Sequence, residues 1–156
     1  MKTKTATLIG AAAKAGGIMA GASIEECERL YEYGNALGVA FQLHDDYLSI
    51  WGNQRETGKI AHGDIVEKKK TLPIIHARDT LSDADRDRLC SLYAALRSLT
   101  ESETEEVVTL VDRSGAQKYV EERIRENIAL ARSACSTLSL SEQQKAQLAS
   151  LAKEIL

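Results

Sequence analysis

Apolar residues recur at intervals of three and four along most of this chain, the spacing that places them on one face of an α-helix. The pattern predicts a first helix over residues 4 to 21. A long second helix is predicted from Ile24 to Trp51, because Ser23 and Glu26 form a capping-box pair at its start. Later helices are predicted over 83 to 98, 102 to 113, 115 to 137 and 141 to 155, the last capped by Ser141. No segment shows the period of two that is typical of strands, so the predicted fold is an all-α bundle.

The segment after Trp51 interrupts the helical pattern. The stretch GNQRETGK, residues 52 to 59, contains two glycines and an asparagine and predicts a surface loop. Asp64, with Glu67 three residues later, predicts the cap of a short helix that continues through TLPIIHA. Pro73 is expected to kink that helix or to mark its true first turn.

Composition agrees with a single helical domain. The chain has 156 residues, of which 44% are hydrophobic and only 4% aromatic, and this length and mixture suit one core built from helices. A net charge of −3 gives no global reason to expect nucleic acid as a partner. Three cysteines lack the spacing of a zinc site or a disulfide framework and are expected to be buried: Cys27, Cys90 and Cys135.

The N-terminus superficially resembles a signal peptide, because Lys2 and Lys4 precede an apolar stretch. Lys14 and paired glycines interrupt that stretch, and no run of 18 apolar residues follows it. We therefore expect no transmembrane segment and a cytoplasmic location.

The long predicted helix carries charge beside its apolar face, in the stretch FQLHDDYLSIW. At about 100° per residue, four residues within about 40° of one another define the core stripe: Gly34, Leu37, Phe41 and Leu48. Asp45 lies about 60° from this stripe and Asp46 about 160°, with Gln42 and Ser49 at about 120° and 100°. Because an unpaired buried charge is costly, the two aspartates are candidate ligands of a hard cation. A solvated helix face is the alternative interpretation of the same pair.

Mg²⁺ suits the side of the helix that carries Asp45 and Asp46, because this ion binds through one or two carboxylates and completes its shell with water and phosphate. Lys59 in the predicted loop, the run of lysines 68 to 70 and Lys4 of the first helix supply cations for that phosphate. A lysine run is otherwise typical of a solvated surface. Tyr47 and Trp51 are expected to anchor packing rather than to contact a substrate.

The stretch FQLHDDYLSIWGNQRETGKIAHGDIVEKKKTLPIIHA resembles the second aspartate-rich region of trans-isoprenyl diphosphate synthases, the polyprenyl synthetase family. The family pattern reads FQxxDDxxD, then GK, then D(I/L)xxxKxTLP. The resemblance extends to KTATL upstream and to SGAQKYVEERIRENIALARSA downstream, so it covers essentially the whole chain. It implies an all-α bundle around a deep cavity, in which isopentenyl diphosphate is joined to an allylic diphosphate with the help of Mg²⁺.

The resemblance also implies a role for each residue of the site. Asp45 would bind Mg²⁺ directly, and Asp46 would support that ion through water or a lysine. Gln42 would face the cavity near the reacting atoms, with Thr5 close to the same wall. The residues that would hold the allylic diphosphate are Lys4, Lys59 and Lys69.

Two departures from the family pattern shape the prediction. Ser49 stands where the motif has its third aspartate, which weakens an outer contact and leaves Asp45 as the principal ligand. The family's first DDxxD motif has no counterpart, because Asp45 and Asp46 are the only adjacent aspartates. We therefore expect residues 1 to 156 to form one all-α domain equivalent to the C-terminal half of a synthase. The leading hypothesis is a split enzyme, completed by a partner chain that carries the first motif.

Three alternatives stay open at this stage. The chain would also fit a non-catalytic subunit that modulates a complete synthase, part of a terpene cyclase of the same fold, or the remnant of a synthase gene. The polar residues retained at Gln42, Asp45, Asp46, Lys59 and Lys69 favour an enzyme, because a purely structural subunit needs no charge at the edge of its core. Product chain length is not assigned.

Overall fold

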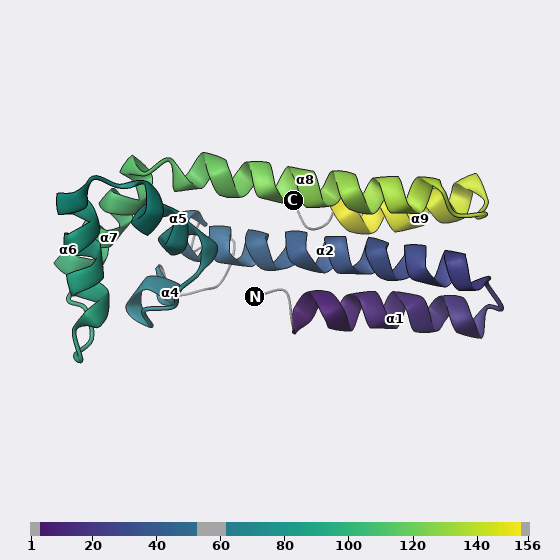
Figure 1. Ribbon diagram of the computed structural model, residues 1–156, viewed down its shortest axis with the longest axis horizontal. Coiled ribbons are helices and arrows are strands. Elements are labelled where there is room, and N and C mark those ends of the chain that lie inside the picture. The colour runs from purple at the N-terminus through teal and green to yellow at the C-terminus, as the bar shows by residue number, and fades with distance from the viewer. Residues whose placement is uncertain (1–3, 53–61, 154–156) are drawn as a thin grey trace. The chain divides into compact units, whose positions relative to one another are not determined.

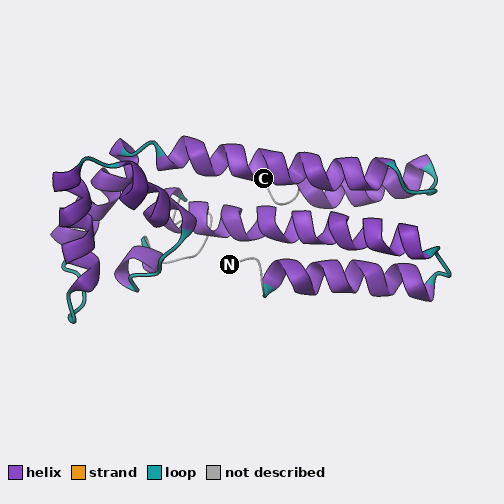
Figure 2. Cartoon of the chain, viewed as in Figure 1, coloured by secondary structure: helices purple, strands orange, loops and turns teal. Residues whose placement is uncertain are grey.

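The computed structural model describes residues 4–52 and 62–153, and all the regular structure in these ranges is α-helical (Figure 1, Figure 2). The helices are α1 (Thr5–Met19), α2 (Ile24–Trp51), α4 (Gly63–Val66), α5 (Leu72–Thr80), α6 (Asp83–Ala94), α7 (Glu101–Arg113), α8 (Ala116–Ser136) and α9 (Glu142–Lys153). The predicted all-α fold class is confirmed. No helix among the described residues is long and apolar enough to cross a membrane.

The helices form two compact units. The first comprises Met1–His44 with Arg123–Leu156, and the second comprises Asp45–Glu122. Helices α2 and α8 each contribute residues to both units. The single-domain organisation stays a prediction.

In the first unit, α1 runs alongside α2 in a close helix pair that depends on glycine (Figure 1). A Cβ atom added at Gly38 would lie 2.6 Å from Cα of Ala6, and one at Gly34 would lie 2.7 Å from the carbonyl oxygen of Ile9. Carbon atoms do not approach backbone so closely, so a larger residue at either position would push the helices apart. The two glycines of α2 therefore set how closely α1 approaches.

The buried side of α2 differs from the predicted stripe. Phe41, which was assigned to the core stripe, is 48% exposed, whereas Asp46, assigned to the opposite side, is 2% exposed. The reason is that α2 packs on more than one side. Its glycines face α1, and the hydroxyl of Tyr33 donates a 2.7 Å hydrogen bond to the carbonyl oxygen of Leu148 on α9. A single stripe on a helical wheel does not describe such a helix.

The second unit has an aliphatic core, to which the end of α2, helices α4 to α7 and the start of α8 all contribute. Each of five core residues is at most 3% exposed: Ile50, Ile65, Leu89, Val107 and Val111. Pro73 lies in the first turn of α5, where its missing N–H would have had no helical partner. Pro73 therefore marks the first turn of a helix, as one of the two expectations had it, and does not kink a longer one.

The helix predicted from Asp64 through TLPIIHA is two helices, α4 and α5. Between them Lys68 has a φ of 50°, in the left-handed region, which ends α4 after one turn. The predicted cap is wrong. His62 occupies the N-cap of α4, and Asp64 lies in the first turn, where its carboxylate accepts a hydrogen bond from Lys69 instead.

Helix α6 ends at Ala94, four residues before its predicted end, and a turn leads from it to α7. The ammonium group of Lys68 donates hydrogen bonds to the carbonyl oxygens of Ala95 and Arg97, the second at 2.7 Å. These carbonyls follow the last turn of α6, and a lysine is a favourable partner there. The side chain of a residue far away in sequence thus satisfies the polar backbone of this turn.

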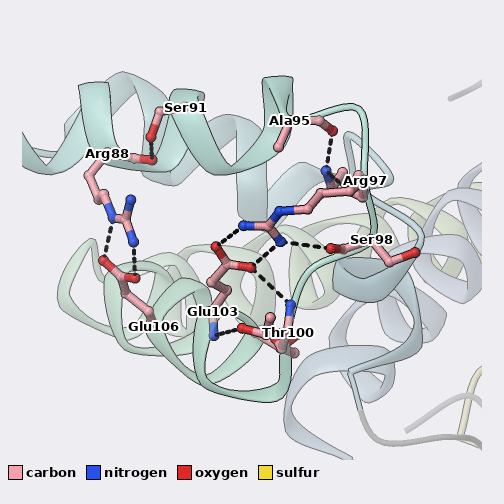
Figure 3. A network of polar contacts seen from close by, with 10 residues as sticks. Arg88, Ser91, Ala95, Arg97, Ser98, Thr100, Glu103 and Glu106 are labelled. Carbon is pink, nitrogen blue, oxygen red and sulfur yellow. Dashed lines mark hydrogen bonds and ion pairs between the residues drawn. The ribbon is translucent and has the colours of Figure 1, made fainter.

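The other side of the turn is fixed by a capping box at the start of α7 (Figure 3). Thr100 Oγ1 accepts from the backbone N–H of Glu103 at 3.2 Å, and the Glu103 carboxylate accepts from the N–H of Thr100 at 2.9 Å. The Arg97 guanidinium forms a bidentate ion pair with the Glu103 carboxylate, with N–O distances of 2.6 and 2.7 Å. Together with the Thr100 N–H, this guanidinium lowers the pKa of Glu103 to about 2.

All three cysteines are free thiols. Cys27 and Cys135 are buried, as predicted, but Cys90 on α6 is exposed. Its helix presents only one side to the core, through Leu89 and Leu92, and Cys90 lies beside that side rather than on it.

Candidate active site

The last three turns of α2 carry the polar residues singled out in the sequence. Gln42, Asp45, Asp46 and Ser49 are spaced three and four residues apart, which places them on one side of the helix. Asp46 and Ser49 are 2% and 7% exposed, whereas Gln42 and Asp45 are partly exposed. Asp45 is therefore the more accessible of the two carboxylates.

Ser49 connects α2 to the start of α4. Its hydroxyl oxygen accepts a 3.1 Å hydrogen bond from the backbone N–H of Asp64. This N–H belongs to the first turn of α4, where backbone donors have no partner within the helix. The residue that replaces the motif's third aspartate therefore holds the next segment of the site against the end of α2.

Asp64 in turn holds Lys69. The ammonium group of Lys69 lies 2.7 Å from Asp64 Oδ1 and 2.9 Å from Glu67 Oε2. Hydrogen bonds to these two carboxylates raise the pKa of Lys69, so it is a cation throughout the physiological pH range. Because the Lys69 side chain is 52% exposed, solvent screens the pair.

The three lysines of the run lie in different surroundings. Lys68 is bound to the turn after α6, Lys69 is bound to Asp64, and Lys70 is exposed. Only Lys69 is linked through Asp64 and Ser49 to the helix that carries the aspartates. The structure therefore distinguishes the lysine that was singled out from its two neighbours.

In the first unit, Thr5 and Gln42 lie side by side. The hydroxyl of Thr5 donates a 3.3 Å hydrogen bond to Gln42 Oε1. Lys4 occupies the N-cap of α1, makes no side-chain cap there, and is exposed. Lys59 lies outside the described residues.

Tyr47 and Trp51 pack together, as predicted, with ring centroids 5.1 Å apart. The Trp51 indole N–H donates to Asp112 Oδ1 at 2.7 Å, and the Tyr47 hydroxyl donates to Glu121 Oε1 at 3.2 Å. These bonds tie the end of α2 to α7 and α8. Both side chains thus support the aspartate-bearing turn.

Comparison with known proteins identifies the family. Residues 1–111 match the model of the polyprenyl synthetase family. The chain belongs to this family. A short chain isoprenyl diphosphate synthase of Methanothermobacter thermautotrophicus is 38% identical over 143 residues, which are 92% of this chain and 43% of that protein. This polyprenyl synthetase chain thus spans less than half the length of that curated relative.

Solved structures of the family share the fold. A polyprenyl synthetase from Streptomyces coelicolor superposes with a TM-score of 0.92 at 26% identity, covering 99% of this chain and 47% of that one. A geranylgeranyl pyrophosphate synthase from Corynebacterium glutamicum, complexed with isoprenyl diphosphate and magnesium, gives a TM-score of 0.80 at 26% identity, covering 90% of this chain and 40% of that one. The fold of this polyprenyl synthetase is therefore the isoprenoid synthase fold.

The donor set of this polyprenyl synthetase fits a hard cation that keeps most of its shell for other ligands. No group of three or more His, Cys, Asp or Glu side chains in the described ranges is arranged to enclose a metal. Mg²⁺ needs no such enclosure, since it is commonly bound by one or two carboxylates with waters and substrate phosphates. A partly exposed aspartate next to a buried one is compatible with that kind of site.

Sequence reasoning missed the part played by Asp64 and Ser49. Asp64 was interpreted as a helix cap and Ser49 as a weakened metal contact. Asp64 and Lys69 are five residues apart, and the break between α4 and α5 is what lets their side chains meet. The sequence pattern predicted one continuous helix here, so this contact was not expected. The signal for Ser49 was its position one turn after the aspartates, on the buried side of α2.

Proposed function

We propose that this chain supplies the second aspartate-rich site of an isoprenyl diphosphate synthase, which joins isopentenyl diphosphate to an allylic diphosphate. The observation that carries the proposal is the linked series Ser49, Asp64 and Lys69 at the end of α2. It places a cationic side chain on the segment that is hydrogen-bonded to the aspartate-bearing helix. A binding site for an anion that arrives with its metal needs both groups.

Asp45 is the proposed metal ligand, with Asp46 in support, and the allylic diphosphate is the proposed anion. Bound Mg²⁺ would neutralise the diphosphate and so stabilise it as a leaving group. Lys69, Lys4 and Lys59 would hold the diphosphate oxygens. When the allylic C–O bond breaks, its electron pair leaves with the diphosphate, and cations placed there stabilise that charge more in the transition state than in the ground state.

Gln42 and Thr5 have a positioning role in this proposal. The hydroxyl of Thr5 donates to Gln42 Oε1, and this bond holds the Gln42 side chain beside the first turn of α1. We infer that this orientation presents Gln42 to the reacting end of the substrate.

A partner chain is part of the proposal. The sequence contains one pair of adjacent aspartates, and α1 presents exposed apolar side chains, among them Leu8 at 71% and Ile18 at 62% exposure. Exposed apolar surface of this kind is typical of an interface. We infer that a polypeptide with the first DDxxD motif completes the site in trans.

The test is to recover the partner and measure prenyl transfer. Tagged chain is used to capture a DDxxD-containing polypeptide from extract of the source organism, and the complex is assayed with radiolabelled isopentenyl diphosphate and geranyl diphosphate. Asp45→Ala should lower kcat by about 100-fold or more, the loss expected when one charge-stabilising group is removed, while the complex still forms. A complex in which Asp45→Ala leaves prenyl transfer unchanged would instead make the chain a non-catalytic subunit.

A further inference from the structure

A cleft between α5 and α6 is lined by residues other than those assigned to prenyl transfer. It has a volume of about 360 Å³, within the range of pockets that hold small molecules. None of its lining residues belongs to the predicted catalytic, metal or diphosphate-binding set. It belongs entirely to the second unit.

The walls of the cleft are apolar. Ile74 of α5 and Leu89 of α6 are 5% and 2% exposed and form part of the core, and Ala94 lies toward the end of α6. These side chains offer no hydrogen bonds. They suit a hydrocarbon chain rather than a sugar or a free phosphate.

The rim of the cleft is cationic. Lys70 precedes α5 and Arg78 lies in its last turn, and no acidic side chain is among the lining residues of the described chain. Arg78 pairs with Asp79 at 2.6 Å, but a guanidinium has five N–H donors, so this pair leaves donors for a second anion. Charge at this rim therefore favours an anionic ligand.

Tyr93 of α6 also lines the cleft, but its hydroxyl is not open to it. Its hydroxyl is buried and has no hydrogen-bond partner among the residues that the structure describes. Because this oxygen has almost no accessible surface, it is not a contact for a ligand in the cleft, and Tyr93 contributes apolar surface to the wall. Burial, and then the negative charge of Asp64, raises the pKa of Tyr93, so the hydroxyl stays a neutral donor.

We propose that this cleft binds an amphiphilic anion: a linear apolar chain packed against Ile74 and Leu89, with its anionic head at the rim formed by Lys70 and Arg78. Prenyl diphosphates and fatty acids share this chemistry. The proposal does not depend on the proposed function, because none of its residues takes part in prenyl transfer.

Cys90 provides the measurement. It lines the cleft and is exposed, whereas Cys27 and Cys135 are buried, so alkylation of the folded chain reports on this thiol. The rate of Cys90 alkylation by iodoacetamide is followed by mass spectrometry on the full chain, with farnesyl diphosphate, laurate, dodecanol or inorganic pyrophosphate added. We expect at least a fivefold slower reaction with an amphiphilic anion. Protection by both farnesyl diphosphate and laurate would identify the ligand class as amphiphilic anions. Protection by farnesyl diphosphate alone would restrict the class to prenyl diphosphates.

Variants separate this cleft from the diphosphate site. Lys70→Ala with Arg78→Ala should abolish protection, and Lys70→Gln alone, at an exposed position, should weaken it if the double variant does not fold. Arg86→Ala, which removes a cation of α6 outside the cleft, and Asp45→Ala should both leave it intact. The proposal is overturned if neither farnesyl diphosphate nor laurate protects Cys90, or if inorganic pyrophosphate protects it equally well. It is also overturned if protection survives the loss of both rim cations, Lys70 and Arg78.

Discussion

Lys69 contacts two carboxylates, Asp64 at 2.7 Å and Glu67 at 2.9 Å, although its side chain is 52% exposed. A diphosphate that binds Lys69 therefore replaces these partners instead of meeting an isolated ammonium group. Exchange of one charge-assisted hydrogen bond for another keeps the cation partnered at each stage. In the proposed site, these acidic neighbours would therefore set how tightly Lys69 holds the diphosphate.

Lys69→Ala should raise KM for the allylic diphosphate about tenfold, because one charge-assisted hydrogen bond contributes roughly 1.5 kcal/mol or more. Lys68→Ala should instead lower the melting temperature with little change in KM, since the carbonyl oxygens of Ala95 and Arg97 lose their donor. Steady-state kinetics of the complex and thermal unfolding of the chain measure the two effects. Lys70→Ala is the exposed control, and equal KM changes at all three lysines would contradict a specific role for Lys69.

At the scale of the helix, the pairing of α1 with α2 depends on the absence of a side chain. Gly38→Ala should lower the free energy of unfolding by about 1–3 kcal/mol, because the new Cβ would meet Cα of Ala6 at 2.6 Å. Urea unfolding of the two proteins gives the difference.

Gly16→Ala is the matched control for that change. It lies on α1 with nothing within 4 Å of an added Cβ, so the methyl group should be tolerated and the helix stabilised by roughly 0.5–1 kcal/mol. If both substitutions destabilise the chain alike, steric contact is not the reason that α2 needs Gly38.

The turn between α6 and α7 should make stability depend on pH. The Arg97 guanidinium and the Thr100 N–H lower the pKa of Glu103 from 4.5 to about 2. A carboxyl group whose pKa is lower in the folded state stabilises that state above its unfolded pKa, and this contribution disappears as pH falls from about 4.5 toward 2. Denaturant unfolding at steps across this range should show a steeper loss for the wild type than for Glu103→Gln. Glu105→Gln, an exposed change on the same helix, should follow the wild type.

The elements most accurately predicted are those whose ends are set by neighbours in sequence. The start of α2 follows from Ser23 and Glu26, which form both capping-box hydrogen bonds, and the start of α9 from Ser141 and Gln144, which do the same. Where an end is set by a distant side chain, prediction failed. Helix α6 ends early at a turn whose carbonyls are bound by Lys68, and no local pattern encodes that contact.

The same distinction applies to the site. Asp45, Asp46 and Lys69 could be singled out as candidates because they belong to a dense local motif. The burial of Asp46 was not predicted, because a helical wheel assumes one buried side, and α2 has neighbours on more than one. The link from Ser49 to Asp64 joins residues 15 apart through a backbone N–H, which has no signature in the side-chain pattern.

At the scale of the whole chain, exposed apolar side chains are the feature that most affects behaviour in solution. Leu8, Ile18, Met19 and Ile24 are between 62% and 89% exposed, and Phe41 is 48% exposed. Leu8 and Met19 are 11 residues apart on α1, which is about three turns, so they lie on one face together with the exposed Ala12 and Ala15. Such a surface is stable in water only when it is small or covered.

We therefore expect the chain purified alone to self-associate, and to become monodisperse when a partner with the first motif covers this surface. Light scattering coupled to size-exclusion chromatography measures the change. A chain that stays monomeric by itself and unfolds cooperatively would argue strongly against assembly with a partner.

The hydrogen bond from the Asp64 amide to Ser49 turns one backbone proton into a reporter. In the first turn of a helix an amide has no intrahelical acceptor, so helix formation alone does not slow its exchange with solvent. The Asp64 amide is protected by Ser49 on another helix. Its exchange rate with solvent therefore measures how often α4 detaches from α2, independently of whether either helix is formed. A ligand that binds Lys69 should make this detachment rarer and so slow the exchange.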